Sequence, residues 1–320
     1  MKTKNIILYL MALLITCSCQ DMFEPADENN RQEDAMYEES KYAAGLLMYG
    51  YSRLPYSTST ETDVATDDAV TNNTNSNFLN MATGTWSSER DPMSKWNSCK
   101  DGIQYVNKFL TIVDKVKWAP SAASKQQMFI DRQKGEAYGL RALFYYNLLQ
   151  AHGGYADDDI LYGVPLLTEP EDGSSDFNQP RALFSDCVKL CFADCDSAMK
   201  YLPMDYVDVA YDDIPAKYKE LGAEITGYNL VFGTRSRGLM SGKIAEAIKA
   251  QVALLSASPA FRAQSGVTSE EAAVLCATVL KRIGALDGFD ATGNIWYKNK
   301  TNLEPSAFEM PEILWRADRS

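Results

Sequence analysis

The chain has 320 residues, of which 43 are acidic and 31 are basic, and its formal net charge is −12. This length can bury one large hydrophobic core or two smaller ones, and 46% apolar residues is too high a share for a disordered chain. The negative charge argues against a nucleic-acid-binding protein, whose contact surface is basic. The single histidine, His152, excludes the zinc-protease motif H-E-x-x-H and leaves a Ser-His-Asp triad only one histidine to use.

A positively charged start followed by a short apolar run is typical of a secretory signal. Lys2 and Lys4 precede an uninterrupted apolar stretch over residues 6–15. Such a stretch is too short to cross the roughly 30 Å hydrocarbon core of a bilayer. No later apolar run approaches the about 18 residues that a transmembrane helix needs. We therefore expect the mature chain to be tethered to a membrane rather than to span it.

Cys19 directly follows the small residue Ser18 and resembles the lipidated cysteine of a bacterial lipoprotein signal. We predict a signal peptide over residues 1–18, a lipid on Cys19 and a tether over residues 19–34. Each buried CH₂ of an acyl chain contributes about 0.8 kcal/mol, so several chains on one cysteine hold a protein firmly on a membrane. Two alternatives stay open. In the first, the lipid is carried by Cys17; in the second, the signal is an ordinary cleaved one and neither cysteine carries a lipid.

Six segments show apolar residues recurring every three or four positions, which is the period of an amphipathic helix. They are residues 33–53, 94–117, 124–151, 185–202, 241–259 and 268–284. Pro55, Pro120 and the pair Gly153-Gly154 follow the first three, as is usual at helix ends. The last segment opens with Thr268-Ser269-Glu270-Glu271, the pattern of a capping box.

Three cysteines of the fourth segment, Cys187, Cys191 and Cys195, repeat every four residues and therefore lie on one side of a helix. Their Cβ atoms would be about 5–6 Å apart, wider than the roughly 3.8 Å of a disulfide. A metal site usually has a second cluster of ligands, and the sequence offers none to pair with these. We expect the three thiols to pack in the core, with no metal or cofactor bound.

Polar stretches separate the helices, over residues 56–92, 152–180 and about 203–238. Loops as long as the first are usually functional or disordered. Helices paired through such loops predict a mainly α fold, an α-solenoid of the tetratricopeptide kind with long irregular loops. No 34-residue self-similarity is legible, so the periodicity alone supports only a helical, solenoid-like architecture.

Five short motifs follow one another in the order seen in one known family. They are QDMF at residues 20–23, WNSCKDGIQYVNKFL at 96–110, GEA-YGLRALFYY at 135–146, GVPL at 163–166 and the helix at 243–255. Together with the lipidation signal, they make the chain resemble the SusD/RagB family of outer-membrane nutrient-binding lipoproteins of Bacteroidetes. The resemblance runs from about residue 17 to residue 315. One departure is Gly102, where the family usually has an apolar or aromatic residue.

The resemblance implies a SusD-like helical domain over residues 35–320, anchored at the outer membrane and facing the cell exterior. It also implies that the protein binds glycan or other nutrient fragments without catalysis. Delivery of these fragments to a TonB-dependent, SusC-like transporter would follow. Family members are usually longer, so the resemblance further implies that the C-terminal part of the family fold is missing from this chain.

The polar loop at residues 56–92 combines the side chains that sugar capture needs. A sugar ring packs its C–H face on a flat aromatic ring, and its hydroxyls bond to Asn, Asp and Arg on loops held by a rigid scaffold. We predict that Trp86 stacks on a sugar and that Asp68 and Arg90 hydrogen-bond to it. Asp67 and Asn77 belong to the same polar mixture. The competing interpretation is that Trp86 packs beneath its own loop.

Structural interpretations are preferred for three other residues. Trp96 lies on the apolar stripe of its helix and is expected in the core. Glu136 and Arg141 are expected to form a structural polar pair, because an acid–base pair needs a cleft and perturbed pKa values.

Two other functions compete with nutrient binding. One is a tetratricopeptide-like scaffold that grips a peptide or protein partner. The other is a hydrolase with two carboxylates about 5–9.5 Å apart. No motif supports the hydrolase, so we expect no enzymatic activity.

Overall fold

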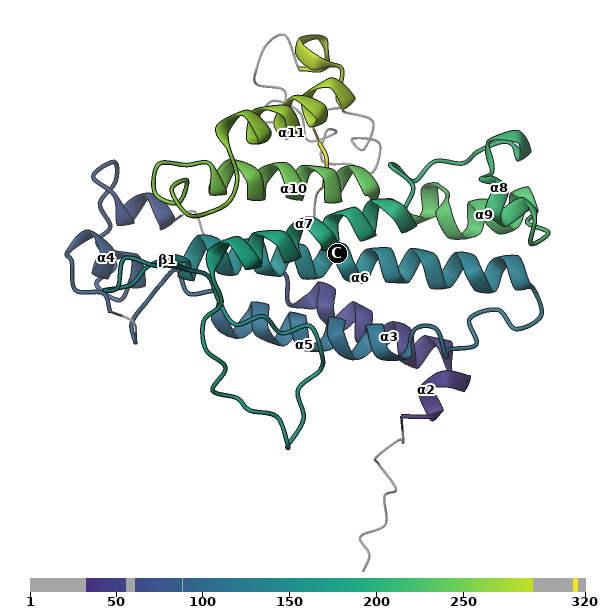
Figure 1. Cartoon of the computed structure of the whole chain (residues 1–320), viewed down its shortest axis with the longest axis horizontal. Coiled ribbons are helices and arrows are strands. Elements are labelled where there is room, and N and C mark those ends of the chain that lie inside the picture. The colour runs from purple at the N-terminus through teal and green to yellow at the C-terminus, as the bar shows by residue number, and fades with distance from the viewer. Residues whose placement is uncertain (1–32, 56–60, 88, 290–312, 316–320) are drawn as a thin grey trace, which may run out of the picture.

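Long helices lying side by side form the body of the protein, in a computed structural model that describes residues 33–55, 61–87, 89–289 and 313–315 (Figure 1). The helices are α2 (Ala35–Glu38), α3 (Ser40–Ser52), α4 (Asn77–Ala82), α5 (Trp96–Ile112), α6 (Ala123–His152), α7 (Phe184–Tyr201), α8 (Ala216–Lys219), α9 (Ile225–Phe232), α10 (Gly242–Ser256) and α11 (Ser269–Arg282). An antiparallel pair of short strands, β1 (Gly154–Tyr155) and β2 (Leu161–Tyr162), follows α6. The predicted signal peptide, Cys19 and residues 19–32 of the predicted tether lie outside the described residues.

The mainly α prediction is confirmed, and a helix occurs in each of the six predicted segments. The first predicted helix is two helices, α2 and α3, because Glu39 between them has a non-helical backbone (φ −106°, ψ 82°). The predicted cap of α11 is confirmed, since Thr268 Oγ1 accepts a hydrogen bond from the Glu271 N–H at 3.1 Å.

Short elements inside the predicted loops were not foreseen. They are α4, α8, α9 and the two strands. Elements of one or two turns contain too few apolar positions to establish a helical period, and two-residue strands show no alternation. The described residues of the segments at 56–92 and 203–238 therefore contain more helix than their composition indicates.

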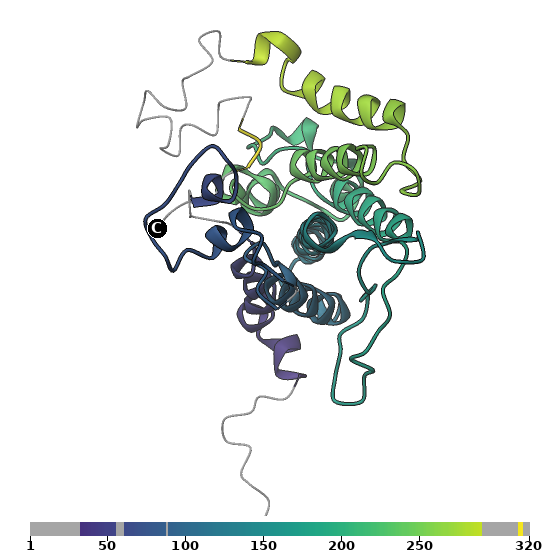
Figure 2. The same cartoon turned by 90° about the vertical axis from the view of Figure 1, so that its left-hand side faces the viewer.

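Successive long helices pack against one another in chain order, as in a solenoid. Helix α3 packs on α5, α5 on α6, α6 on α7, α7 on α10 and α10 on α11. Figure 2 views the long helices nearly end-on and shows α6 in the interior. Helix α6 accordingly buries side chains around its whole circumference, including Met128, Leu140, Phe144 and Tyr145. Burial on every side makes α6 the central helix of the fold, although it also buries polar side chains such as Glu136 and Arg141.

The predicted core position of Cys187, Cys191 and Cys195 is confirmed, because each side chain is 0% exposed. Cys191 Sγ lies 3.9 Å from the carbonyl oxygen of Ala142 on α6, and Cys187 Sγ lies 3.3 Å from that of Val164. Burial raises the pKa of the Cys191 thiol well above its ordinary value, and the thiol stays protonated. Within the described ranges, no group of three or more His, Cys, Asp or Glu side chains is arranged to hold a metal ion.

Glycine allows α5 and α6 to approach closely. A Cβ atom at Gly102 would lie 2.3 Å from Cζ of Phe144, whose ring is fully buried. The departure from the family pattern at Gly102 therefore has a physical reason, since the Phe144 ring occupies the space that a side chain at residue 102 would fill.

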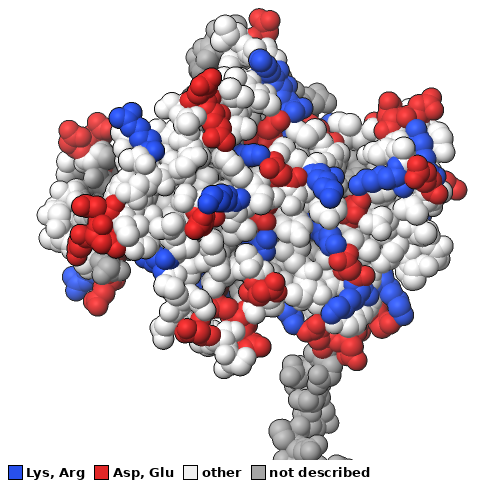
Figure 3. Space-filling model, in the orientation of Figure 1, with Lys and Arg blue, Asp and Glu red and all other residues white. Residues whose placement is uncertain are grey.

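Charged side chains of both signs are interspersed on the face of the protein shown in Figure 3. This face shows no continuous basic track that a phosphate backbone could follow. Among the helices of the described part of the chain, none is long and apolar enough to cross a membrane.

We expect Gly102→Ala to lower the free energy of unfolding by about 1–3 kcal/mol, because the new methyl group overpacks the Phe144 ring. The control Gly45→Ala, also inside a helix, places its Cβ where nothing lies within 4 Å. It should raise the free energy of unfolding by about 0.5–1 kcal/mol. Urea denaturation of both variants measures the difference, and equal effects would contradict the close approach of α5 to α6.

Candidate functional site

The three predicted sugar-binding residues lie in the chain segment that connects α3 to α5, and all three are exposed. Trp86 is 52% exposed, so it does not pack wholly beneath its loop, and Asp68 and Arg90 are exposed as well. The Arg90 N–H donates to the Ser87 carbonyl at 2.9 Å and closes a tight turn beside Trp86. No hydrogen bond or ion pair within the described residues joins any two of Asp68, Trp86 and Arg90. Their role in binding stays a prediction.

A cavity of about 310 Å³ lies between the start of α5, the end of α6 and the segment 163–181. Aliphatic side chains form its floor, namely Ile103, Leu148, Val164, Pro165 and Leu167. Two aromatic rings and several polar side chains complete the lining, namely Trp96, Phe177, Lys100, His152, Glu171, Gln179 and Arg181. Neither Trp86 nor the other two predicted sugar-binding residues is among them.

The prediction that Trp96 lies in the core is wrong. The ring is 37% exposed and lines the cavity, where it meets the His152 ring edge-to-face at 5.8 Å. Trp96 is the first residue of α5, and the end of α6 covers only part of it. Periodicity identified the correct helix face but gives no information on how far the neighbouring helix extends.

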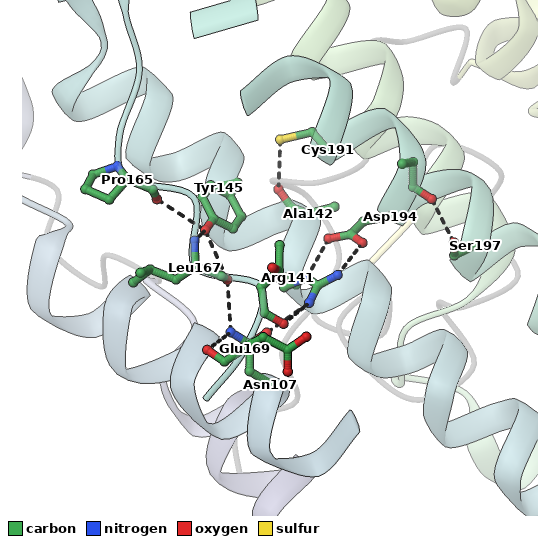
Figure 4. A network of polar contacts seen from close by, with 12 residues as sticks. Asn107, Arg141, Ala142, Tyr145, Pro165, Leu167, Glu169, Cys191, Asp194 and Ser197 are labelled. Carbon is green, nitrogen blue, oxygen red and sulfur yellow. Dashed lines mark hydrogen bonds and ion pairs between the residues drawn. The ribbon is translucent and has the colours of Figure 1, made fainter. Parts of the chain in front are cut away.

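A buried polar network holds the wall of this cavity in place (Figure 4). The Asn107 side-chain amide on α5 donates to the carbonyl oxygens of Leu167 at 2.9 Å and Glu169 at 3.1 Å. The Tyr145 hydroxyl on α6 accepts the Leu167 N–H at 2.6 Å. These side chains satisfy backbone groups of an irregular segment that the helices alone leave unpaired.

Gln104 on α5 extends this attachment by pairing with the backbone of Glu171. Its Nε2 donates to the Glu171 carbonyl at 2.7 Å, and its Oε1 accepts the Glu171 N–H at 2.8 Å. The wall from residue 165 to residue 171 is thus fixed by helix side chains before any ligand binds.

Glu136 and Arg141 are buried polar residues, as expected, but they do not pair with each other. Arg141 donates from Nε and Nη2 to the two carboxylate oxygens of Asp194 on α7, at 2.7 and 2.8 Å. Glu136 accepts from the Tyr51 hydroxyl at 2.8 Å and lies 3.1 Å from Nε of Arg132. Each thus has its own partner, because the two point toward different neighbouring helices.

Positive charge predominates among the polar groups that line the cavity. Lys100 Nζ lies 3.4 Å from Oε2 of Glu171, so these two charges offset each other. Arg181 donates only to backbone carbonyl oxygens, those of Gly163 at 2.8 Å, His152 at 2.9 Å and Tyr162 at 3.1 Å. Its positive charge has no carboxylate partner among the described residues.

His152 is held as a neutral ring. Its Nε2 accepts the backbone N–H of Lys95 at 3.2 Å, so this nitrogen carries no proton. Burial lowers the pKa of His152 below the ordinary 6.5, and the positive charge of Arg181 lowers it further against an opposing effect of Asp91. Because its Nε2 already serves as a structural acceptor, that nitrogen is not free to act as a general base.

This cavity is not apparent from the sequence. Residues 152–180 were predicted to be a connecting loop, and no site was predicted at Lys100, Phe177 or Arg181. The GVPL motif at 163–166 marks the start of the wall, but no local signal indicates that it folds back across α5 and α6. A cavity lined from three separate segments appears only in the tertiary structure.

A solenoid of helices with a small preformed cavity and an exposed polar loop is the architecture of a helical binding protein. Comparison with protein-family models identifies the family. Residues 28–217 match the SusD-like family described as "Starch-binding associating with outer membrane". The match spans more than half of the sequence, and the chain belongs to the SusD-like family.

Solved structures share the fold. A SusD-like protein from Bacteroides fragilis matches with a TM-score of 0.55 and 18% identity, over 81% of this chain and 41% of its own. A SusD-like carbohydrate binding protein from Bacteroides vulgatus matches with a TM-score of 0.57 and 15% identity, over 88% and 51%. Surface glycan-binding protein A from Bacteroides uniformis matches with a TM-score of 0.53 and 14% identity, over 86% and 52%.

The chain thus spans about half the length of the solved structures that it matches. Comparison with curated proteins gives no match. At these identities the likeness establishes the fold alone.

The depressed pKa of His152 predicts a pH-dependent stability. The unfolded chain takes up this proton near pH 6.5 and the folded chain only at lower pH. The contribution of neutral His152 is therefore complete above about pH 6.5 and is lost as the pH falls from there through the folded-state pKa.

Urea denaturation between about pH 7.5 and 5.5 checks this expectation against the variant His152→Gln. Gln offers an acceptor oxygen to the Lys95 N–H but does not titrate. The free energy of unfolding of the wild type should fall more steeply toward low pH than that of the variant. Parallel pH profiles would contradict the assignment, and because the chain has a single histidine, no other one contributes.

Proposed function

We propose that this protein is a lipid-anchored, surface-exposed outer-membrane protein that binds glycan or other nutrient fragments and delivers them to a SusC-like, TonB-dependent transporter. The observation that carries the proposal is the match of residues 28–217 to a family described as starch-binding and associated with the outer membrane. The lipidation signal at Cys19 supports the same location. The solved relatives named as a carbohydrate binding protein and a surface glycan-binding protein support the same ligand class.

The loop before α5 supplies our proposed glycan-binding surface. Trp86 presents more than half of its surface to solvent, and the turn that follows it, with a bridge between Ser87 and Arg90, places a cationic residue four positions further along the chain. Asp68 lies on the same loop and is exposed. An aromatic platform with flanking hydrogen-bonding groups suits a sugar ring, whose two faces are apolar and whose edge carries hydroxyls.

The proposal includes no chemical step. The one histidine has its Nε2 occupied by the Lys95 N–H. The buried carboxylates Asp194 and Glu136 are paired inside the helical stack, away from the exposed loop. The family match supports nutrient binding rather than the competing scaffold function, in which the solenoid grips a peptide partner.

Lipidation at Cys19 predicts a specific N-terminal peptide. Mass spectrometry of the membrane fraction should detect a lipid-modified peptide that begins at Cys19. The variant Cys19→Ala, with Cys17 retained, should move the protein out of the membrane fraction. A peptide that begins at Cys17, or an unmodified one that begins at Gln20, would contradict the assignment.

If Trp86 stacks on a sugar, replacing it should weaken glycan binding without destabilising the fold. A glycan array on the mature chain first identifies a ligand, and Trp86→Ala should then weaken its binding by about tenfold or more, equivalent to about 1.4 kcal/mol. The thermal midpoint should change little, because the ring is exposed.

Trp118→Ala is the matched control for this experiment. Trp118 packs on Phe109 and donates from Nε1 to the Val113 carbonyl at 2.9 Å. Its removal should destabilise the fold by up to about 3–5 kcal/mol. If Trp86→Ala instead lowers the thermal midpoint as much as Trp118→Ala and leaves binding intact, Trp86 is a packing residue.

A further inference from the structure

The cavity between α5, α6 and the segment 163–181 has the features of a second binding site, separate in its lining residues from the loop that carries Trp86. Its volume of about 310 Å³ lies at the lower end of the roughly 300–1,000 Å³ typical of small-molecule sites. It can therefore enclose one small ring or two, and not a folded chain. The wall is preformed, because Asn107, Tyr145 and Gln104 fix the backbone from residue 165 to residue 171.

Two aromatic rings stand partly uncovered at this cavity. Trp96 is 37% exposed and Phe177 is 59% exposed. The edge contact with His152 orients the Trp96 ring, and the ring lines the cavity. The aliphatic floor continues this apolar surface. A flat ligand with an apolar face suits the arrangement.

The polar groups at the cavity favour a negative charge on that ligand. Glu171 Oε1 is buried from solvent and accepts no hydrogen bond from the described residues, and Oε2 lies 3.4 Å from Lys100 Nζ, so this carboxylate offsets the charge of Lys100 and is not open to a ligand. The Arg181 guanidinium is anchored through Nε and Nη2 to carbonyl oxygens, and its Nη1 makes no hydrogen bond with the described residues. With His152 neutral, Lys100, Glu171 and Arg181 leave one uncompensated positive charge. A guanidinium is well suited to bind a carboxylate.

Exposed acidic side chains around the cavity limit how much negative charge can enter. Glu169, Asp172 and Asp176 lie on the same segment, outside this cavity, and Figure 3 shows acidic side chains gathered below the helices. They repel a densely charged polymer that approaches the segment. Solvent screens them over about 8–10 Å, so a single carboxylate in direct contact with Arg181 is attracted more strongly than it is repelled.

We infer that this cavity binds one sugar ring that carries a single carboxylate, a uronic acid residue. The ring lies with its C–H face on Trp96, and the carboxylate faces Arg181 and Lys100. The inference rests on the proposed function for the sugar class and goes beyond it in assigning a second site and an acidic ligand.

Titration calorimetry of the mature chain with methyl glucuronide and methyl glucoside tests the inference directly. The uronide should bind with a dissociation constant below about 1 mM and at least about tenfold more tightly than the neutral glycoside. Equal binding of the two sugars, no saturable binding of the uronide, or equally tight binding of benzoate would each overturn it.

Variants locate the binding. Trp96→Ala should weaken uronide binding by about tenfold or more, and Lys100→Gln should weaken it by about three- to tenfold while leaving the weak glucoside binding unchanged. Lys95→Gln is the matched control, since it removes the same charge one turn earlier on the chain from a residue that does not line the cavity. An equal loss in Lys95→Gln and Lys100→Gln would assign the effect to overall charge and overturn the site.

Two further measurements keep the outcome unambiguous. A melting curve for each variant shows whether it folds, and Lys100→Arg, which keeps the charge, should retain most of the uronide binding if Lys100→Gln proves unstable. The proposed function fails separately. A chain that binds a glycan through Trp86 but no methyl glucuronide keeps that function and loses this inference, whereas uronide binding with no effect of Trp86→Ala on any glycan keeps this inference and removes Trp86 from the proposed glycan-binding surface.

Discussion

The buried ion pair between Arg141 and Asp194 is the interaction on which the arrangement of the helices depends. It joins the two most closely associated helices, α6 and α7, through two parallel hydrogen bonds of 2.7 and 2.8 Å. Burial raises the pKa of Asp194, and the hydrogen bonds and positive charge of Arg141 oppose that rise. Removing one partner of such a pair leaves an uncompensated buried charge, which typically costs about 3–5 kcal/mol. The pair therefore restricts how α6 and α7 can be placed relative to each other.

The same arginine extends this constraint to the surface. Its Nη1 donates to the Asn107 side-chain oxygen at 2.9 Å, which orients the Asn107 amide toward the backbone of residues 167 and 169 (Figure 4). The buried Arg141–Asp194 pair thus helps to fix the backbone of the irregular segment that includes residues 167 and 169. Preformed walls of this kind favour binding, because little conformational entropy is lost when a ligand enters. The cavity beside Trp96 owes its shape to this chain of contacts, whereas the exposed loop with Trp86 is not part of it.

The two candidate binding surfaces differ in how far the sequence revealed them. Trp86, Asp68 and Arg90 were found from composition, because a polar stretch with an aromatic ring is visible without any knowledge of the fold. The cavity was missed because its lining comes from residues 96–103, 148–152 and 164–181. Each of these segments looks ordinary by itself. Trp96 was assigned to the core since it continues an apolar stripe, and only the end of α6 at His152 decides that the ring remains partly exposed.

By itself, the sequence determined the helical segments, the cap at Thr268, the burial of the Cys187–Cys191–Cys195 ladder and the resemblance to the family. Helices, cap and cysteine ladder each depend on residues within a few turns of one another, and the period of a helix records them directly. The resemblance depends on short local motifs and their order along the chain. Tertiary structure alone decided that Arg141 pairs with Asp194, 53 residues away, and not with Glu136 on its own helix. It also decided that Asn107 bonds to Leu167, 60 residues away, and that Lys100 and Arg181 meet at one cavity. Side chains on one helix share a period, but which neighbour they face depends on how the helices pack, and no local pattern encodes that choice.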